Sequence, residues 1–103
     1  MDYEVVWTDG AIIDVEEIAQ YIQKDSPFYA DSVVTKIVEA TRLLESFPLS
    51  GRAVPEENDK NVREHFIYNY RLIYEIRDFR IFVLTVVHGK RILHLDLEKE
   101  LEE

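Results

Sequence analysis

The segment from residue 51 to residue 91 holds most of the side chains that could do chemistry. It carries eight lysines and arginines against six acids, a local balance of +2 in a chain of 103 residues whose formal net charge is −9. Guanidinium and ammonium groups bind phosphate and carboxylate oxygens through charge-assisted hydrogen bonds. The candidates for such a site are Arg52, Arg63, Arg71, Lys90 and Arg91. The distribution predicts a basic face on one layer of the fold, with a solvated surface of mixed charge as the alternative.

Glu56 and His88 could take part in proton transfer. A carboxylate can act as a general base, and an imidazole exchanges protons near neutral pH. Each residue also has a structural interpretation. Glu56 shares a loop with Glu57 and Asp59, which suits a solvated acidic turn. His88 ends a predicted buried strand, where a hydrogen-bonded structural histidine fits.

Arg71 lies on a predicted strand over residues 70–76, whose side chains alternate between two faces. One face is apolar and aromatic and consists of Tyr70, Leu72, Tyr74 and Ile76. The other presents Arg71, Ile73 and Glu75 and is more polar, so we expect Arg71 to be partly exposed. It then either binds a phosphate or forms an ion pair with Glu75. Because exposed ion pairs contribute about 0 to 1 kcal/mol, Arg71→Ala should destabilise the fold by no more than about 1 kcal/mol.

The elements that must position these residues follow from the hydrophobic periodicity. Residues 3–7 favour a β-strand, and Thr8 can cap the helix that the apolar spacing predicts over residues 9–24. Ser26 caps a second helix with Pro27 at its first position, and the pattern stops near residues 47–48. The apolar face of this second helix consists of Ala30, Val33, Ile37, Ala40 and Leu44. The two helices form a predicted hairpin whose apolar faces need a partner layer.

A long loop and a three-stranded meander follow the helical hairpin. Residues 49–59 show no sustained period, and strands are predicted over residues 62–67, 70–76 and 81–88. After Arg91, Leu93, Leu97 and Leu101 recur at every fourth residue, which predicts a short closing helix or tail. We therefore expect an α+β fold in a single domain over residues 1–103. The helical hairpin packs on one face of an antiparallel sheet, which the first strand joins.

The composition excludes several kinds of site. The chain has no cysteine, so it forms neither a disulfide scaffold nor a thiolate metal site, which fits a reducing cytoplasm. His65 and His94 lack the paired spacing of a zinc site, and we expect no metal and no cofactor. No stretch approaches the roughly 18 to 20 apolar residues of a membrane span. We expect a cytoplasmic protein that has no contact with a membrane.

Four segments of the chain resemble the RelE/ParE family of small bacterial toxins, which are encoded beside an antitoxin. They are residues 50–56 (SGRAVPE), 62–64 (VRE), 69–76 (NYRLIYEI) and 87–91 (VHGKR). Their order and spacing make the match more specific than any one segment, and it spans nearly the whole chain. The resemblance implies the toxin of a type II toxin–antitoxin pair, with a cognate antitoxin as its protein partner.

The resemblance also implies one of two targets. ParE-like members are non-enzymatic poisons of DNA gyrase, whereas members similar to RelE and YoeB are mRNA endonucleases that act on the ribosome. In a nuclease, Glu56, Arg71 and His88 would be the catalytic residues. Glu56 and His88 resemble the glutamate and histidine of YoeB-like enzymes, and Arg71 occupies the arginine position of the family's Tyr-Arg motif. A third possibility is a domain that has lost toxicity and only binds its antitoxin.

Two observations favour the gyrase branch. RelE-like members carry lysines on the first strand of the meander, where this chain has Val62, Arg63 and Glu64, and a tyrosine near the C-terminus, where this chain has none after Tyr74. A net charge of −9 would also repel ribosomal RNA over most of the surface. We therefore expect ParE-like inhibition of DNA gyrase, with mRNA cleavage as the alternative.

Overall fold

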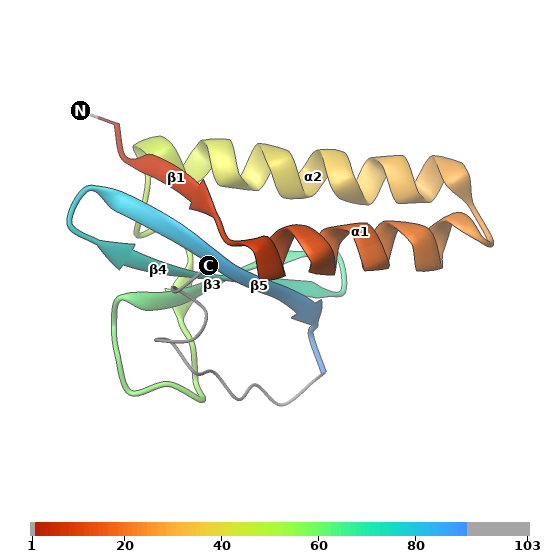
Figure 1. The fold of residues 1–103 in the computed structure, drawn as a ribbon. Helices are drawn as coiled ribbons and strands as arrows, with labels where there is room; N and C mark the ends of the chain where they lie inside the picture. The colour runs from red at the N-terminus through yellow and green to blue at the C-terminus, as the bar shows by residue number, and fades with distance from the viewer. Residues whose placement is uncertain (1, 91–103) are drawn as a thin grey trace.

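The two helices lie side by side and cover one face of a sheet (Figure 1). The computed structural model describes residues 2–90. Its elements in chain order are β1 (Glu4–Trp7), α1 (Asp9–Gln23), α2 (Pro27–Ser46), β2 (Arg52–Ala53), β3 (Val62–Ile67), β4 (Tyr70–Arg77) and β5 (Arg80–His88). The strands are ordered β1-β5-β4-β3-β2 across the sheet. The predicted α+β class, with a helical hairpin packed on a sheet, is confirmed.

Side-chain caps fix the start of both helices, as the sequence predicts. The Thr8 hydroxyl accepts a hydrogen bond from the Ala11 N–H, and the Ser26 hydroxyl accepts one from the Tyr29 N–H. Pro27 occupies the first turn of α2, where its missing N–H leaves no helical hydrogen bond unmade. Local chemistry therefore determines where each helix begins.

β3, β4 and β5 form the predicted antiparallel meander, and β1 joins it in parallel. Tyr68 and Asp78 in the two short turns have φ angles of 52° and 54°, the left-handed region that tight hairpin turns use. β1 pairs with β5 from Glu4 opposite Arg80 to Trp7 opposite Val83. The sheet is therefore mixed. Parallel neighbours need a long connection, which the helices and the rest of the meander supply.

The main core lies between the helices and the sheet. α2 contributes the residues that its periodicity predicts, each at most 6% exposed: Ala30, Val33, Ile37, Ala40 and Leu44. Leu72, Tyr74, Ile81 and Val83 of the sheet belong to the same cluster. Burial of a Leu or Ile side chain contributes roughly 1.5 to 3 kcal/mol, so this layer dominates the hydrophobic stabilisation.

The segment between β2 and β3 covers the opposite face of the sheet. Val54 from this segment packs with Val62, Ile73 and Leu84, and all four are at most 1% exposed. The prediction that this face of β4 is open is wrong, because Arg71 and Glu75 on that face are 4% and 5% exposed. Alternation shows which residues share a face, but it does not show that a distant loop covers it.

The predicted closing helix at Leu93, Leu97 and Leu101 lies outside the described residues. Among residues 2–90, neither helix combines the length and the apolar character needed to cross a membrane.

The fold predicts that Thr8 contributes more to stability than an ordinary helix cap. Besides capping α1, its hydroxyl donates to the Val83 carbonyl at 2.9 Å, and Thr8 is 6% exposed. Thr8→Ala should lower the free energy of unfolding by about 2 kcal/mol, because it removes a cap and the buried hydrogen bonds that the hydroxyl donates to the Val83 and Leu84 carbonyls. Ser26→Ala, a cap that bonds only within its own helix, should cost about 1 kcal/mol. Urea unfolding of both variants measures the difference, and equal costs would contradict the link between Thr8 and the sheet.

Candidate functional site

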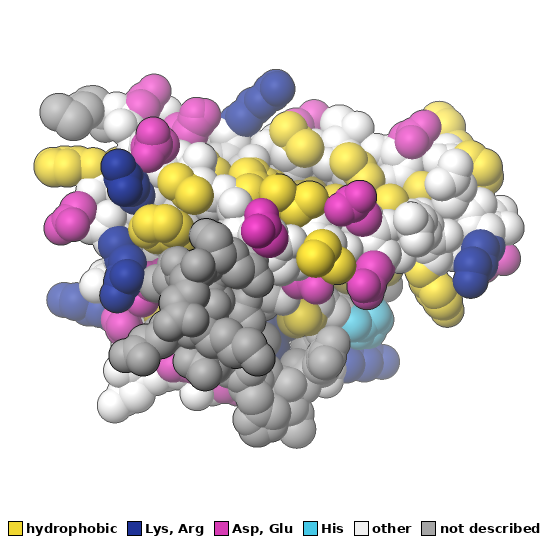
Figure 2. Space-filling view, viewed as in Figure 1, with side chains coloured by type: hydrophobic (Ala, Val, Ile, Leu, Met, Phe, Trp, Pro, Cys, Tyr) yellow, Lys and Arg dark blue, Asp and Glu magenta, His cyan; other side chains and the backbone are white. Residues whose placement is uncertain are grey.

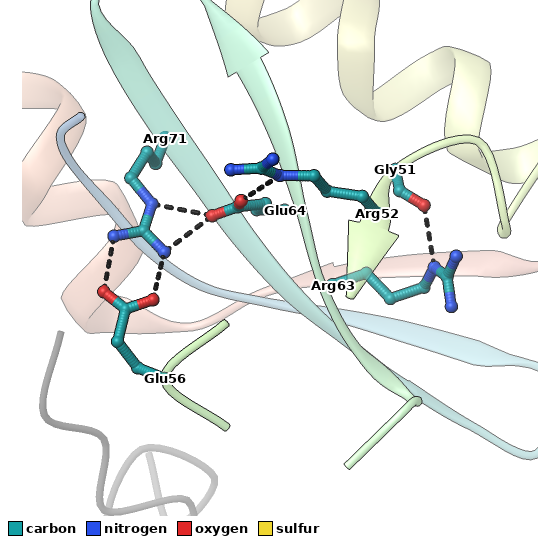
Figure 3. A network of polar contacts seen from close by, with 6 residues as sticks. All are labelled: Gly51, Arg52, Glu56, Arg63, Glu64 and Arg71. Carbon is teal, nitrogen blue, oxygen red and sulfur yellow. Dashed lines mark hydrogen bonds and ion pairs between the residues drawn. The ribbon is translucent and has the colours of Figure 1, made fainter. Parts of the chain in front are cut away.

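Arg71 lies buried between two carboxylates on the second face of the sheet (Figure 3). Its Nη1 and Nη2 donate to Oε2 and Oε1 of Glu56, both at 2.8 Å, which makes a bidentate pair. Its Nε donates to Glu64 Oε1 at 2.7 Å, and Nη2 lies 2.6 Å from the same oxygen. The side chains of Arg71 and Glu64 are 5% and 0% exposed, and that of Glu56 is 25% exposed. One guanidinium is thus held by two carboxylates away from water.

Arg52 completes this arginine–glutamate network, which we define as Arg52, Glu56, Glu64 and Arg71. The Nε of Arg52 donates to Glu64 Oε2, and its guanidinium carbon lies 5.1 Å from the centre of the Phe66 ring. The two positive and two negative charges balance. The buried Arg71 and Glu64 require partners, since moving an unpaired ion out of water costs several kcal/mol. The hydrogen bonds that Arg71 donates to Glu56 raise the pKa of Arg71 despite its burial, so this guanidinium stays charged.

The pairing of β3 with β4 explains why Arg71 meets Glu64 and not Glu75. Phe66 lies opposite Arg71, and Glu64 is the diagonal neighbour two residues away on the same face. Glu75 shares that face but lies four residues along the same strand, about 13 Å away. The predicted ion pair of Arg71 with Glu75 is therefore wrong, and Arg71 is buried rather than partly exposed.

Arg63 and Tyr74 hold the connection between α2 and β2. Arg63 donates from Nε to the Gly51 carbonyl at 2.8 Å, and the Tyr74 hydroxyl donates to the Pro48 carbonyl at 2.8 Å. The Tyr74 hydroxyl also accepts from the Gly51 N–H at 3.0 Å. A Cβ at Gly51 would overlap a carbonyl oxygen of β3 and lie 2.7 Å from that hydroxyl, so only glycine fits. Arg63 therefore has a structural role, and burial raises the pKa of Tyr74.

His88 lies on the other face of the sheet from Arg71. It pairs with Tyr70, the neighbour of Arg71 on β4, and neighbouring residues of a strand point to opposite faces. His88 is exposed, its ring lies 5.9 Å from the Tyr70 ring in an edge contact, and its Nδ1 accepts from the Lys90 N–H at 3.2 Å. The structure thus brings Glu56 and Arg71 together and separates both from His88.

The cations predicted to bind a target differ in their surroundings. Arg71 and Arg52 bind glutamates and Arg63 binds carbonyls of its own chain. The second sheet face is therefore not basic as the charge count predicts, because Glu56 and Glu64 match the two arginines there. Lys90 is exposed beside His88, and Arg91 lies outside the described residues. A role for any of them in binding a target stays a prediction.

Glu75 is a second buried acid on the same face. It is 5% exposed, and its Oε1 lies 3.3 Å from Arg77 Nε but accepts no hydrogen bond from the described residues. Burial raises the pKa of Glu75, and Asp59 and Glu57 act in the same direction, whereas Arg77 opposes them. The ionised form of Glu75 therefore lowers the free energy of unfolding relative to the neutral form.

The sequence alone assigns no role to Glu64, although it is the acid that links both arginines. Its signal is an acid at the middle of a strand, on the face that also carries Val62. Such a residue must find a cation when that face is buried. The position of Glu64 points to a buried ion pair only once it is known that the segment between β2 and β3 covers this face.

The comparisons with known proteins agree with this architecture. The family model described as the ParE toxin of the type II toxin–antitoxin system parDE matches residues 5–93. The chain belongs to the ParE toxin family. A relative from Sinorhizobium fredii, Y4kP, is 36% identical over 84 residues, which are 81% of this chain and 84% of the relative. The protein is therefore a toxin of the type II toxin–antitoxin class, and the predicted RelE/ParE resemblance is confirmed.

Three solved structures share the fold of this ParE family member. A chain of the chromosomal ParDE system of P. aeruginosa is 21% identical, with a TM-score of 0.69 over 85% of this chain and 97% of the other. A chain of the RelBE2 toxin–antitoxin complex of Mycobacterium tuberculosis is 23% identical, with a TM-score of 0.62 over 85% and 99%. E. coli RelE, in a free double-mutant form, is 16% identical, with a TM-score of 0.63 over 87% and 86%. At these identities the likeness extends to the fold alone.

The network predicts that Arg71→Ala is strongly destabilising, in contrast to the small cost expected from the sequence. Removing the guanidinium leaves Glu56 and the fully buried Glu64 without their main partner. The free energy of unfolding should fall by about 3 to 5 kcal/mol. Arg80→Ala is the matched control, because Arg80 forms a surface ion pair with Glu4 at 3.1 Å, and it should cost about 0 to 1 kcal/mol. Chemical unfolding of both variants measures these losses. If Arg71→Ala lowered the free energy of unfolding as little as Arg80→Ala does, the result would contradict the buried network.

The raised pKa of Glu75 predicts that replacing this residue stabilises the protein at neutral pH but not at acidic pH. Because its pKa is higher in the folded than in the unfolded protein, its contribution to stability is greatest below the unfolded pKa of about 4.3. This contribution declines as the pH rises through the folded pKa. Glu75→Gln should therefore raise the Tm at pH 7 and lose that advantage near pH 4. Thermal unfolding at both pH values tests this, with Glu16→Gln on the exposed face of α1 as the control. A lower Tm for Glu75→Gln at pH 7 would show that the pair with Arg77 outweighs the cost of burial.

Proposed function

We propose that this toxin inhibits growth by binding DNA gyrase, as ParE-like members of the family do, and that a cognate antitoxin neutralises it. The observation that carries the proposal is the separation of His88 from Glu56 and Arg71 by the sheet. A protein that acts by binding needs no such triad. The match to a ParE toxin model over residues 5–93 supports the same branch.

The chemistry of mRNA cleavage explains why this separation matters. Attack by a ribose 2′-hydroxyl on the adjacent phosphate needs a base, a proton donor and a cation around one phosphorus atom. Glu56 and Arg71 contact each other at 2.8 Å, but His88 lies on the helix side of the sheet, where it lines a hollow with Asp14 and Tyr21 of α1. These three side chains cannot act on one phosphate in this arrangement.

The occupied guanidinium of Arg71 gives a second reason. Glu56 takes two of its nitrogens and Glu64 approaches from the other side. A phosphate would have to displace the bidentate carboxylate of Glu56 to reach Arg71. On the face shown in Figure 2, acidic side chains are spread over the helical layer, which disfavours contact with RNA.

Cleavage of mRNA on the ribosome remains the second candidate function. The observation that favours it is the direct contact between Glu56 and Arg71, two of the three residues that the family resemblance implies for catalysis in a nuclease. Displacement of Glu56 by a substrate phosphate would free both groups at once. His88 would still have to be replaced in its role by another proton donor.

An antitoxin partner is supported by the family and by the shape of the surface. Two of the structures that share this fold belong to ParDE and RelBE2 toxin–antitoxin systems. Several large apolar side chains are also well exposed here, among them Tyr21, Phe28, Phe66 and Tyr68 at 70%, 83%, 48% and 50%. Tyr68 also contacts Tyr29, which is 39% exposed, at 5.6 Å between ring centres, and neighbouring exposed apolar side chains of this kind are typical of binding surfaces.

Two assays on the purified protein separate the candidate functions. We expect inhibition of DNA supercoiling by gyrase and no cleavage of mRNA on translating ribosomes. His88→Ala should inhibit supercoiling within about twofold of the wild type, whereas loss of a general acid in a nuclease would reduce cleavage by roughly 10²- to 10⁴-fold. Cleavage of ribosome-bound mRNA that disappears in His88→Ala would overturn the proposal. Absence of both activities would favour the non-toxic domain that only binds its antitoxin.

A further inference from the structure

β1 covers only the first half of β5. Its pairing with β5 ends at Val83. Further along, the Gly89 N–H donates to the Asn69 carbonyl beside β4, and alternate residues of a strand direct their backbone groups to the same edge. Val86 and His88 therefore direct theirs away from β4, to the edge that β1 leaves uncovered. An uncovered edge of this kind can pair with another strand.

The free backbone groups on this edge select the direction of such a strand. Asp14 of α1 takes one of the groups, because its Oδ2 accepts from the Val86 N–H at 3.1 Å. Within residues 2–90, neither the Val86 carbonyl nor the His88 N–H has a hydrogen-bond partner. A carbonyl and an N–H two residues apart on one strand are bridged by a single residue of a parallel neighbour. The edge thus suits a strand parallel to β5, in line with β1.

A hollow of about 380 Å³ lies beside this edge, between α1 and the end of β5. Ile18 and Tyr21 of α1 and Tyr70 of β4 supply its apolar lining, and Tyr21 is 70% exposed. Asp14 and Glu17 of α1 make its wall acidic. Glu17 is exposed and forms no ion pair with the part of the chain that the structure describes. The hollow thus offers aromatic surface and a carboxylate beside free backbone groups.

The charge of the hollow favours a basic occupant. A lysine or arginine can form an ion pair with Glu17 and can lie over an aromatic ring such as that of Tyr21. The acidic wall repels nucleic acid, and a second copy of this chain would bring the same acids to the interface. Residues 92–103 of the chain carry five acids against Lys99, so their charge does not match either. A basic segment of another protein is complementary to the hollow.

We propose that DNA gyrase, the target of this toxin, contributes an extended basic segment that adds to the sheet beside Val86, in line with β1. One residue of the segment would bridge the Val86 carbonyl and the His88 N–H. Its neighbours would place an apolar side chain against Tyr21 and a lysine or arginine beside Glu17. Strand addition to a sheet edge with pockets for side chains is a known mode of peptide recognition.

This inference rests on the function proposed above, and the supercoiling assay separates the two. If the wild type failed to inhibit supercoiling, the proposed function and this inference would both be rejected. If the wild type inhibited supercoiling and variants of the hollow did so equally well, this inference alone would fail.

Paired variants test the hollow by inhibition of supercoiling and by titration calorimetry with purified gyrase. Glu17→Lys should raise the inhibitory concentration by about tenfold or more, because it replaces an attractive charge with a repulsive one. Glu16→Lys makes the same change in charge at an exposed neighbour that does not line the hollow, and its effect should stay below about twofold. Equal effects of the two variants would overturn the proposal.

A second pair tests the aromatic lining. Tyr21→Ala should weaken gyrase binding by about tenfold, because exposed aromatic residues often dominate interfaces. Phe47→Ala should change it by less than about twofold, since Phe47 is 61% exposed at the C-terminal end of α2 and does not line the hollow. Equal losses would remove the hollow from the interface. Circular dichroism of each variant confirms that the fold is intact.

Amide hydrogen exchange on the wild-type protein tests the backbone contact without any variant. Exchange of the His88 amide, read at single-residue resolution by mass spectrometry, should slow by about tenfold or more in the complex with gyrase. The Gly89 amide already donates to Asn69 and should change little. The contact uses the backbone of His88 and not its side chain. An unchanged His88 amide in a formed complex would overturn the proposal.

Two further outcomes would assign the edge to another occupant. The calorimetry is carried out without DNA, so a complex that forms only when gyrase holds DNA would point to contact with nucleic acid and would overturn the proposal. Protection of the His88 amide in the free toxin that is lost on dilution would assign the edge to a second copy of this chain.

Discussion

The ion pairs of Arg71 with Glu56 and Glu64 constrain much of this structure. A charged guanidinium at 4% exposure is tolerated only because two carboxylates meet it with good geometry. One carboxylate comes from the neighbouring strand and the other from the segment between β2 and β3. The requirement to neutralise Arg71 therefore fixes the position of that segment, and with it Val54 and the small second core.

The network also decides which parts of the surface can act on other molecules. Three of the arginines that the charge pattern marks as candidates, Arg52, Arg63 and Arg71, contact the protein itself through Glu56, Glu64 and the Gly51 carbonyl. Among the exposed aromatic residues, Phe28 lies at the start of α2, and Tyr68 lies in the turn between β3 and β4. Tyr29 and Tyr68 meet there at 5.6 Å between ring centres. A surface of this composition is suited to binding proteins more than to holding a phosphate.

The two faces of the sheet thus have different physical characters. The helix side carries the large hydrophobic core and supplies most of the stability through apolar burial. The other side combines four buried aliphatic residues with a balanced set of charges. Charged groups of this kind add little net stability, but they require one specific arrangement of the covering loop. Arg71 and His88 lie on opposite faces because His88 pairs with Tyr70, and Tyr70 and Arg71 are adjacent on β4.

The sequence by itself determined both helices, the strands other than β2, and the main core, whereas β2 lies inside the predicted loop over residues 49–59. Helix caps at Thr8 and Ser26, the apolar face of α2 and the three strands of the meander depend on local chemistry and on periods of 3.6 and 2 residues, which can be read without knowing any distant contact. The family follows from four short segments in order. The tertiary structure alone decided the partners of Arg71, because Glu56 is 15 residues away in the chain and reaches it through a loop without periodicity. Diagonal pairing across β3 and β4 selected Glu64 over Glu75, and register is a property of two strands together. The sequence thus identifies which residues could form a site, and the packing of the loop on the sheet decides which of them meet.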